Sequence, residues 1–365
     1  MPQDNRKYNS MSGKKSFSYL LLILHFLTTT AAASSSAVLY DIYPFIRVYK
    51  DGTVKRFIGT EVVPASVDPT TGVRSKDVVI TAPELHISAR LYLPKYATST
   101  HKLPLLVYFH GGAFFTESAF SPLYHNHLNS IVAKANVVAV SVNYRLAPEH
   151  PLPIGYQDSW HALKWVFSHS DGNGNETWLK NYADFMHVYL GGDSAGGNIA
   201  HNTAIRAGLE HEMVHRVVID GMFLNCPHFW GKTPIGNEAS KPKREALMES
   251  IWIHAYPNST GLDDPLVNPA MDPNLSKLRC KRVLVYVAEK DILRDRGWYY
   301  EKALRKSKWD GVVKVVEVKG EDHDFSIIFP NSRKAKIVLR QLASFLNQGK
   351  VLDSFAGHLT AVPSN

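Results

Sequence analysis

Short apolar runs recur along the chain and are separated by longer stretches of mixed polarity. Val, Leu, Ile and aromatic residues dominate the runs at 105–109, 137–142, 188–190, 217–222, 283–287 and 312–318. A run without alternating polar positions is typical of a strand that is buried on both faces, as in parallel sheets. Each run therefore predicts a strand, and 105–109 and 137–142 in particular predict strands that are buried on both faces.

Between these runs, apolar residues recur at helical spacing. The segments with this spacing are 122–134, 158–169, 297–306 and 333–346. Alternation of buried strands with helices predicts an α/β protein whose mostly parallel sheet is covered on both faces. Nearer the N-terminus, 77–81 and 87–94 predict a strand pair. The segment 43–58 predicts a short helix or loop, and then a hairpin that turns at Asp51-Gly52.

One long segment interrupts this alternation. Residues 223–279 have no strand pattern but contain an amphipathic stretch at 244–255 and several aromatic residues. An insertion of this length in an α/β sheet is most simply a cap over the carboxyl ends of the strands, where ligands bind in such folds. We therefore expect a helical cap rather than a loose surface loop.

The first 36 residues differ from the rest. Lys14 and Lys15 precede the apolar run 17–27, and Ala31-x-Ala33 follows it, a pattern typical of a secretory signal peptide at 11–33. A Ser-rich, acid-poor leader also fits a plastid transit peptide, or upstream sequence that the mature product lacks. The protein is expected in the secretory pathway if the signal peptide is genuine, and otherwise in the cytoplasm or a plastid. The run is too short for a stable membrane span.

Composition narrows the function classes. The chain has 365 residues, of which 45% are hydrophobic, so it can bury a sizeable core. The formal charge is +8, but Lys and Arg are scattered, which favours a solvated surface over a nucleic-acid interface. The two cysteines, Cys226 and Cys280, exclude a disulfide scaffold and a multi-cysteine zinc site, and leave a single bridge open.

Glycines surround one serine in the sequence G-G-D-S-A-G-G-N at 191–198. An apolar run precedes this stretch and an alanine-rich, helix-compatible stretch follows it, with Gly192 and Gly196 flanking Ser194. A strand, a tight glycine turn and a helix form the context of a nucleophile elbow, where strained backbone requires small neighbours. The alternative is a glycine turn that only connects a strand to a helix.

A nucleophilic serine needs a base and an acid that orients the base. On an α/β sheet with this turn, the acid and the histidine follow the serine in that order, each just past a strand. Asp291 follows the run 283–287, with Glu289 and Asp295 as rivals, and His323 follows the run 312–318. Position singles out His323 among 17 histidines. We predict a triad of Ser194, Asp291 and His323.

Donors for the oxyanion are expected from a second glycine turn. His110-Gly111-Gly112-Ala113-Phe114 directly follows the run 105–109. The backbone N–H groups of Gly111 and Gly112, with that of Ala195, are predicted to converge on one oxygen. The aromatic residues expected to line an apolar substrate pocket are Phe114, Phe115, Trp230 and Trp252. These aromatic side chains could equally pack the interior of the cap.

The motifs resemble those of the plant carboxylesterases in the hormone-sensitive-lipase-like α/β-hydrolase group. They are H-G-G-A-F at 110–114, Y-R-L-A-P-E-H-P-L-P at 144–153, G-D-S-A-G-G-N at 192–198, D-D-P-L-V-N-P at 263–269 and D-H-D-F at 322–325. The resemblance implies an α/β-hydrolase fold over 37–348, with an eight-stranded sheet. It also implies a cap built from about 37–60 and 223–279, and leaves 349–365 as a C-terminal tail.

The same resemblance implies Ser194 as nucleophile, Asp291 as acid and His323 as base, without a metal or organic cofactor. Ala113 stands where the wider group often has a third glycine. The expected function is hydrolysis of a small apolar or aromatic carboxylic ester through an acyl-enzyme. The resemblance leaves two alternative functions on this scaffold. One is elimination of water, as in 2-hydroxyisoflavanone dehydratases, some of which also have serine at the nucleophile position. The other is hormone binding, as in the gibberellin receptor, which lacks the catalytic histidine that this chain keeps. The sequence does not indicate an oligomeric state.

Overall fold

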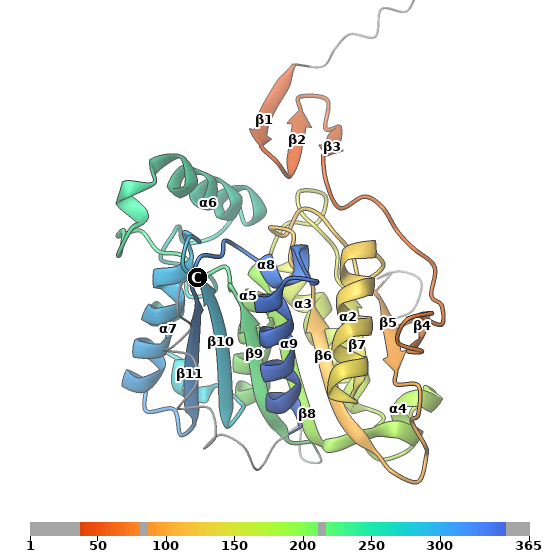
Figure 1. The fold of residues 1–365 in the computed structure, drawn as a ribbon. Coiled ribbons are helices and arrows are strands. Elements are labelled where there is room, and N and C mark those ends of the chain that lie inside the picture. Colours follow the sequence, from red (N-terminus) through yellow and green to blue (C-terminus); the bar gives the residue numbers. More distant parts are fainter. Residues whose placement is uncertain (1–36, 81–86, 211–216, 348–365) are drawn as a thin grey trace, which may run out of the picture.

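The computed structural model describes residues 37–80, 87–210 and 217–347, in which eight strands form one sheet (Figure 1). In sheet order the strands are β11 (Val312–Val318), β10 (Arg282–Ala288), β9 (Ile219–Asn225), β8 (Ala183–Asp193), β6 (Leu103–Phe109), β7 (Val138–Asn143), β5 (Ser88–Leu93) and β4 (Arg74–Val79). All neighbours from β11 to β7 pair in parallel, and β5 alone pairs antiparallel on both sides. The predicted eight-stranded, mostly parallel sheet is confirmed.

Helices cover both faces of this sheet, which explains the uninterrupted apolar runs. The long helices are α2 (Pro122–Ala135), α3 (Ile154–Phe167), α5 (Ser194–Leu209), α7 (Arg294–Lys306) and α9 (Arg333–Leu346). One buried cluster contains side chains of α3, α5 and α7, and a second contains those of α2 and α9. The strands therefore separate two hydrophobic layers. Two shorter helices are α4 (Thr177–Tyr182) and α8 (Phe325–Ile328).

Two strand boundaries differ from the sequence prediction. Strand β8 extends from Ala183 to Asp193, well beyond the predicted run, because its first half includes the exposed Met186 and His187, which conceal the apolar pattern. Strand β9 continues to Asn225, so residues 223–225 belong to the sheet and not to the insertion. Both extensions matter because they carry the chain to the edge of the sheet where the candidate site lies.

The N-terminal segment forms a separate small sheet. Strands β1 (Val38–Ile42), β2 (Ile46–Tyr49) and β3 (Val54–Arg56) pair antiparallel, and the predicted hairpin turn at Asp51-Gly52 joins β2 to β3. Of the two alternatives predicted for the start of 43–58, a short helix or a loop, the structure has a turn at 43–45 that connects β1 to β2. Strand β1 was not expected from the pattern, because Val38 and Leu39 are exposed.

Residues 37–60 and the part of 226–279 that carries α6 (Pro242–Ala255) lie over the carboxyl ends of the strands (Figure 1). Residues 269–277 pack instead against α7 and α5, as the chain returns to the sheet. We call residues 37–60 and 226–279 together the cap. The second segment also contains the short 3-10 helices η2 (Glu238–Ser240), η3 (Pro269–Met271) and η4 (Leu275–Lys277). Strand β1 contacts α6, and the ring centres of Tyr40 and His254 lie 4.1 Å apart. The two cap segments therefore meet, although they lie far apart in the sequence.

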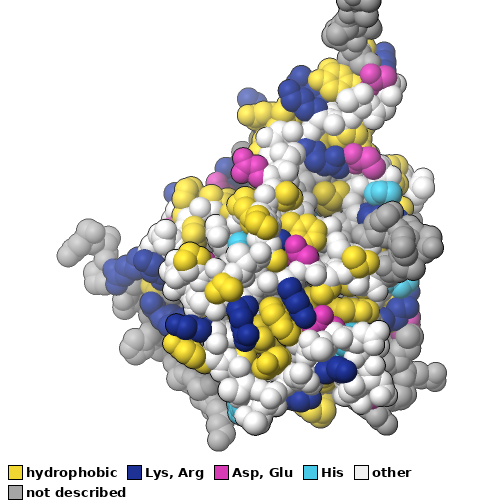
Figure 2. Space-filling model, turned by 90° about the vertical axis from the view of Figure 1, so that its right-hand side faces the viewer, with side chains coloured by type: hydrophobic (Ala, Val, Ile, Leu, Met, Phe, Trp, Pro, Cys, Tyr) yellow, Lys and Arg dark blue, Asp and Glu magenta, His cyan; other side chains and the backbone are white. Residues whose placement is uncertain are grey.

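Four further sequence expectations concern the ends of the chain, the two cysteines, membrane spans and surface charge. The predicted leader and the tail at 349–365 lie outside the described residues. Both cysteines are buried and free, so the open possibility of a bridge between them is not realised. No helix within the described ranges is long and apolar enough to cross a membrane. On the face shown in Figure 2, Lys and Arg side chains are interspersed with hydrophobic and acidic ones.

A buried ion pair joins the cap to the sheet domain. Arg296 on α7 donates to both carboxylate oxygens of Glu238 on η2, at 2.6 and 2.7 Å, and the two side chains are 3% and 0% exposed. Arg296 also donates to the carbonyl oxygens of Gly231 and Thr233. Since each charge is buried, loss of either partner leaves the other without compensation.

We predict that Glu238→Gln lowers the free energy of unfolding by about 3–5 kcal/mol, because the Arg296 charge stays buried and loses its counter-ion. Denaturant-induced unfolding followed by fluorescence measures the change. The matched control is Glu301→Gln, which breaks the pair with the exposed Arg305 one helical turn away. This control should have a much smaller effect, because the Arg305 side chain is 63% exposed and water solvates its charge when the partner is lost. Equal effects of the two substitutions would contradict the role of the buried pair.

Candidate active site

Ser194 occupies the sharp turn between β8 and α5. Its φ angle is +46°, a left-handed conformation that non-glycine residues rarely adopt, and such strain is typical of functional turns. A Cβ atom at Gly196 would lie 2.0 Å from the carbonyl oxygen of Phe109, and one at Gly192 would lie 2.4 Å from that of Gly196. Both flanking glycines are therefore required by close backbone approach. The strand, turn and helix have the geometry of a nucleophile elbow.

A cavity of about 510 Å³ opens above this turn. Ser194, Asp291 and His323 all line it. Each follows a different strand of the sheet, namely β8, β10 and β11, so the parallel topology brings their three loops to one edge. The structure thus gathers the three residues that the sequence singled out.

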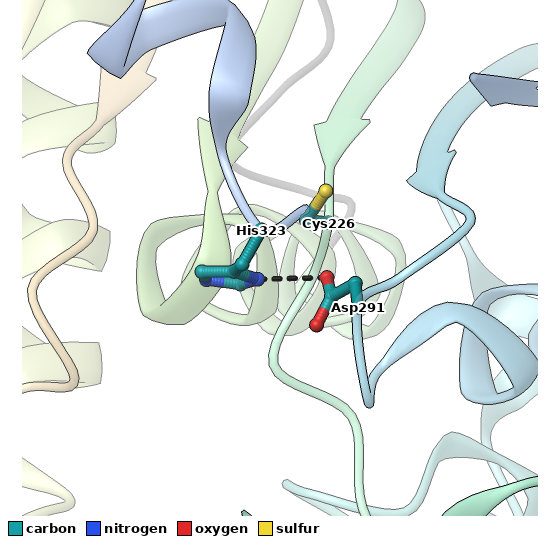
Figure 3. A group of neighbouring side chains, drawn as sticks. All are labelled: Cys226, Asp291 and His323. Atoms are coloured by element: carbon teal, nitrogen blue, oxygen red, sulfur yellow. Dashed lines mark hydrogen bonds and ion pairs between the residues drawn. The ribbon is translucent and has the colours of Figure 1, made fainter. Parts of the chain in front are cut away.

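Asp291 and His323 form a short hydrogen-bonded pair (Figure 3). The distance from His323 Nδ1 to Asp291 Oδ2 is 2.7 Å, and the other carboxylate oxygen accepts from the backbone N–H of Leu293 at 3.0 Å. The rival acids contact other groups: Glu289 accepts from the N–H of Gly320, and Asp295 accepts from that of Asn237. Asp291 is therefore the carboxylate that orients the Nδ1 side of the imidazole.

A second carboxylate, which the sequence analysis did not identify, lies on the other side of the ring. His323 Nε2 is 3.1 Å from Asp324 Oδ2. Burial alone would lower the pKa of His323, but the charges of Asp291 and Asp324 outweigh it and raise that pKa well above its usual value. Of the two acids in the motif D-H-D-F, Asp324 is the one whose carboxylate lies against the imidazole, whereas the Asp322 carboxylate pairs with Arg244. The left-handed backbone at Asp324, with φ of +50°, brings that side chain back to the ring.

The expected oxyanion donors need one correction. The N–H of Gly111 donates to the hydroxyl oxygen of Tyr124 at 2.8 Å and to Asp193 Oδ1 at 3.2 Å, so the prediction that it faces the substrate is wrong. Gly112 and Ala113 line the cavity instead, both with positive φ. No hydrogen bond engages either N–H within the described part of the chain. The N–H of Ala195, in the first turn of α5, also lacks an intrahelical acceptor.

The predicted aromatic pocket is wrong as well. The side chains of Phe114, Phe115, Trp230 and Trp252 are at most 1% exposed and do not line the cavity. Phe114 packs edge-on against Trp252, and the Arg296 guanidinium lies 5.1 Å from the centre of the Trp230 ring. They form the interior of the cap and its contact with the sheet, which was the stated alternative.

Aliphatic and aromatic side chains from separate segments form the actual apolar lining. They are Pro44, Phe45 and Ile58 from the first cap segment, Leu247, Met248 and Ile251 from α6, Leu123 from α2, Ile292 and Leu293 from the loop after β10, Ile327 and Ile328 from α8, and Phe329 directly after it. Residue type alone did not identify these side chains as pocket residues, because isolated apolar residues are common in any segment. Only the docking of the cap brings them together.

Cys226 completes the group drawn in Figure 3. Its Sγ, one Asp291 oxygen and one His323 nitrogen lie within 4.8 Å of one another, a spacing at which a metal ion could be considered. Burial raises the pKa of the Cys226 thiol to about 12, whereas metal ions bind the thiolate. In addition, the hydrogen bond between His323 and Asp291 already uses one donor atom of each. These residues fit a hydrogen-bonded acid–base pair better than a metal site.

Comparison with known proteins agrees with this geometry. Residues 106–327 match the model of a family with the alpha/beta hydrolase fold. The chain belongs to this α/β-hydrolase family.

Curated relatives cover most of the chain. The chain is 49% identical to a protein of Glycyrrhiza echinata named 2-hydroxyisoflavanone dehydratase, over 83% of this chain and 94% of that one. It is 47% identical to a protein of Arabidopsis thaliana named "Probable carboxylesterase 13", over 85% and 98%.

Solved structures of esterases have the same architecture. EstE1, described as a thermophilic carboxylesterase from a metagenomic library, aligns with a TM-score of 0.64 and 27% identity, over 78% of this chain and 90% of that one. An esterase of the archaeon Pyrobaculum calidifontis aligns with a TM-score of 0.62 and 29% identity, over 75% and 85%.

The pairing of Asp291 with His323 gives a testable pKa effect. We predict that Asp291→Asn lets the His323 imidazole lose its proton at a pH roughly 1–3 lower than in the unmodified chain, because an adjacent carboxylate stabilises the imidazolium. NMR titration of ¹⁵N-histidine, assigned with His323→Gln, measures it. The control Glu289→Gln removes a neighbouring carboxylate that does not contact the ring. An unshifted titration in Asp291→Asn would contradict the assignment of the acid.

Proposed function

We propose that the chain hydrolyses carboxylic esters through an acyl-enzyme formed on Ser194. The observation that carries this proposal is the 2.7 Å pair of His323 and Asp291 in the same cavity as a serine on a strained elbow. The chain-wide similarity to proteins named carboxylesterases, and to solved esterases, supports the same reaction class. Ester hydrolysis is therefore the function that the site supports best.

In the proposed mechanism, His323 Nε2 accepts the proton of Ser194 Oγ as the oxygen attacks the ester carbonyl carbon. Asp291 keeps the Nδ1 proton in place and stabilises the imidazolium that forms. In the resting arrangement Nε2 faces Asp324, so the ring must turn toward Ser194 before the attack. The imidazolium then protonates the departing alcohol, and the acyl group remains on Ser194.

The tetrahedral intermediate carries a negative charge that needs fixed donors. We assign this role to the backbone N–H groups of Gly112, Ala113 and Ala195, with the positive end of the α5 dipole beside them. Each such donor contributes about 3 kcal/mol of transition-state stabilisation. Water activated by His323 then attacks the acyl carbon, and the carboxylic acid leaves as Ser194 regains its proton.

The lining of the cavity indicates the substrate class. Leu247, Met248 and Ile251 of α6 line the cavity of about 510 Å³ together with Phe45 and Ile292. Such a surface gains binding energy from apolar acyl or alcohol groups, at about 25 cal/mol per Å² removed from water. We therefore propose small apolar or aromatic esters as substrates.

We predict that Ser194→Ala lowers kcat for a short-chain p-nitrophenyl ester by at least about a thousandfold, because no acyl-enzyme can form. Release of p-nitrophenol measures turnover. The control Ser130→Ala removes a hydroxyl on α2 that donates to the Asn126 carbonyl oxygen of its own helix, and it should leave turnover unchanged. Full activity in Ser194→Ala would overturn the proposed nucleophile, and absence of turnover in the unmodified chain would overturn the esterase.

A second function is favoured by one specific observation. Proteins named 2-hydroxyisoflavanone dehydratase from Glycyrrhiza echinata and Glycine max are 49% and 43% identical to the chain, over 83% and 85% of its length. On the same floor of the cavity, His323 would remove a proton from the carbon next to the carbonyl group of a 2-hydroxyisoflavanone, and the oxyanion donors would hold the carbonyl oxygen. The imidazolium would then give this proton to the departing 2-hydroxyl group, so that a carbon–carbon double bond forms and one water leaves. Isoflavone formation followed by chromatography distinguishes this lyase from the esterase.

A further inference from the structure

The Nε2 atom of the candidate base has a partner that its role in ester hydrolysis does not need. Asp324 Oδ2 lies 3.1 Å from this atom, and Asp324 Oδ1 accepts from Asn225 Nδ2 at 2.7 Å, so the carboxylate is fixed on both sides. Only 8% of the Asp324 residue is exposed. Nε2 is also the atom that must receive the proton of Ser194. Asp324 and Ser194 therefore compete for one nitrogen.

A second buried acid lies behind Asp324. Asp193 accepts from the hydroxyls of Tyr108 at 2.7 Å and Tyr124 at 2.6 Å, and its carboxyl group is in hydrogen-bonding contact with that of Asp324. It is 1% exposed and directly precedes Ser194 in the chain. Two carboxyl groups in such contact, both out of water, hold one proton between them rather than two negative charges. Burial raises the pKa of Asp193 to about 8, and burial also raises that of Asp324.

The ionisable groups around His323, other than Asp291 and the Asp193–Asp324 pair, are either neutral or compensated by an opposite charge. The groups that face it are Asp291 after β10, Cys226 and His228 after β9, Asp193 at the end of β8, Asp322 and Asp324 on its own loop, and Arg244 on α6 beside Asp322. Cys226 and His228 are neutral, because burial raises the pKa of the thiol and lowers that of the imidazole to about 3. Arg244 compensates Asp322 at 2.9 Å. The charges left to act on His323 are those of Asp291 and of the Asp193–Asp324 pair.

We propose that Asp324 is a positioning residue that holds Nε2 of His323 away from Ser194 in the resting enzyme, and that Asp193 weakens this hold by sharing one proton with Asp324. The inference rests on the proposed function of Ser194 and His323. While His323 is protonated, its two N–H groups donate to Asp291 and Asp324. When the Nε2 proton leaves to water, the nitrogen lone pair and the Asp324 carboxylate repel each other. The ring is then free to turn toward Ser194.

The two acids of the pair should act in opposite directions. In Asp324→Asn the remaining negative charge lies on Asp193, farther along the pair from the imidazole, so His323 loses its proton more easily. In Asp193→Asn no carboxylic acid is left to share a proton, so Asp324 carries the full charge and holds the imidazolium more tightly. Both replacements are isosteric, and Asn tolerates the left-handed backbone at position 324.

The experiment measures kcat/KM for a p-nitrophenyl ester, and the rate at which a fluorophosphonate labels Ser194, from acidic to alkaline pH. Activity requires the neutral imidazole, so it rises with pH through the pKa of His323. We expect the midpoint of this rise to move lower by roughly one pH unit in Asp324→Asn and higher in Asp193→Asn. Below the original midpoint, Asp324→Asn should be up to about tenfold faster than the unmodified enzyme.

The control is Glu321→Gln, which removes a carboxylate from the same loop. Glu321 pairs with Lys334 and does not contact the imidazole, so the pH profile should stay unchanged. Thermal unfolding verifies that each variant is folded, and either variant of the pair alone is sufficient for the test. A purely structural role of Asp193 and Asp324 would lower activity in both variants without moving the midpoints in opposite directions.

NMR titration of the His323 imidazole gives a readout independent of any substrate. If folded Asp324→Asn and Asp193→Asn titrate like the unmodified chain, the positioning role is overturned, whatever the ester assay gives. If the unmodified chain neither turns over esters nor reacts with the fluorophosphonate, the proposed function fails instead. In that case opposite shifts of the imidazole titration still support the control of His323 by the acid pair.

Discussion

The close approach of the elbow to the end of β6 is the constraint on which the site depends. The backbone at Gly196 comes so near the Phe109 carbonyl oxygen that no Cβ atom fits between them. This contact fixes the loop after β6 against the first turn of α5. The candidate donors at Gly112 and Ala113 and the candidate nucleophile Ser194 therefore belong to one rigid part of the cavity floor. The strained backbone at Ser194 is maintained because β6 and β9, which pair with β8 on its two sides, hold the end of β8 in place.

The sheet could be predicted because burial on both faces leaves a direct trace in the sequence. The same is true of the pair of Asp291 and His323, since parallel topology brings the ends of consecutive strands together. Gly111 could not be assigned correctly, because its N–H is taken by Tyr124 and Asp193, whose positions depend on helix α2 and the end of β8. The cavity lining could not be predicted either, because it depends on how the cap docks on the sheet. The aromatic residues that were expected to line the pocket fill the interior of the cap instead.

The cap separates the choice of substrate from the chemistry. The floor of the cavity carries the elbow and the candidate base and acid, while α6 and the loops beside β1–β3 supply one apolar side of it. The Arg296–Glu238 pair fastens the second cap segment to α7, away from the reacting atoms. Changes in the walls can therefore alter which molecule fits without disturbing the floor. This division agrees with the finding that relatives of similar identity carry the names of a hydrolase and of a lyase.

The contact between β1 and α6 has a consequence for biosynthesis. The strands β1–β3 leave the ribosome early, but the helix that they touch emerges only after most of the sheet, and the loop that carries His323 later still. The first cap segment therefore lacks its packing partner α6 while the central strands assemble. An enclosed apolar cavity exists only after translation has passed α6. The growing chain thus completes its candidate site only after the residues of the elbow at Ser194 have been synthesised.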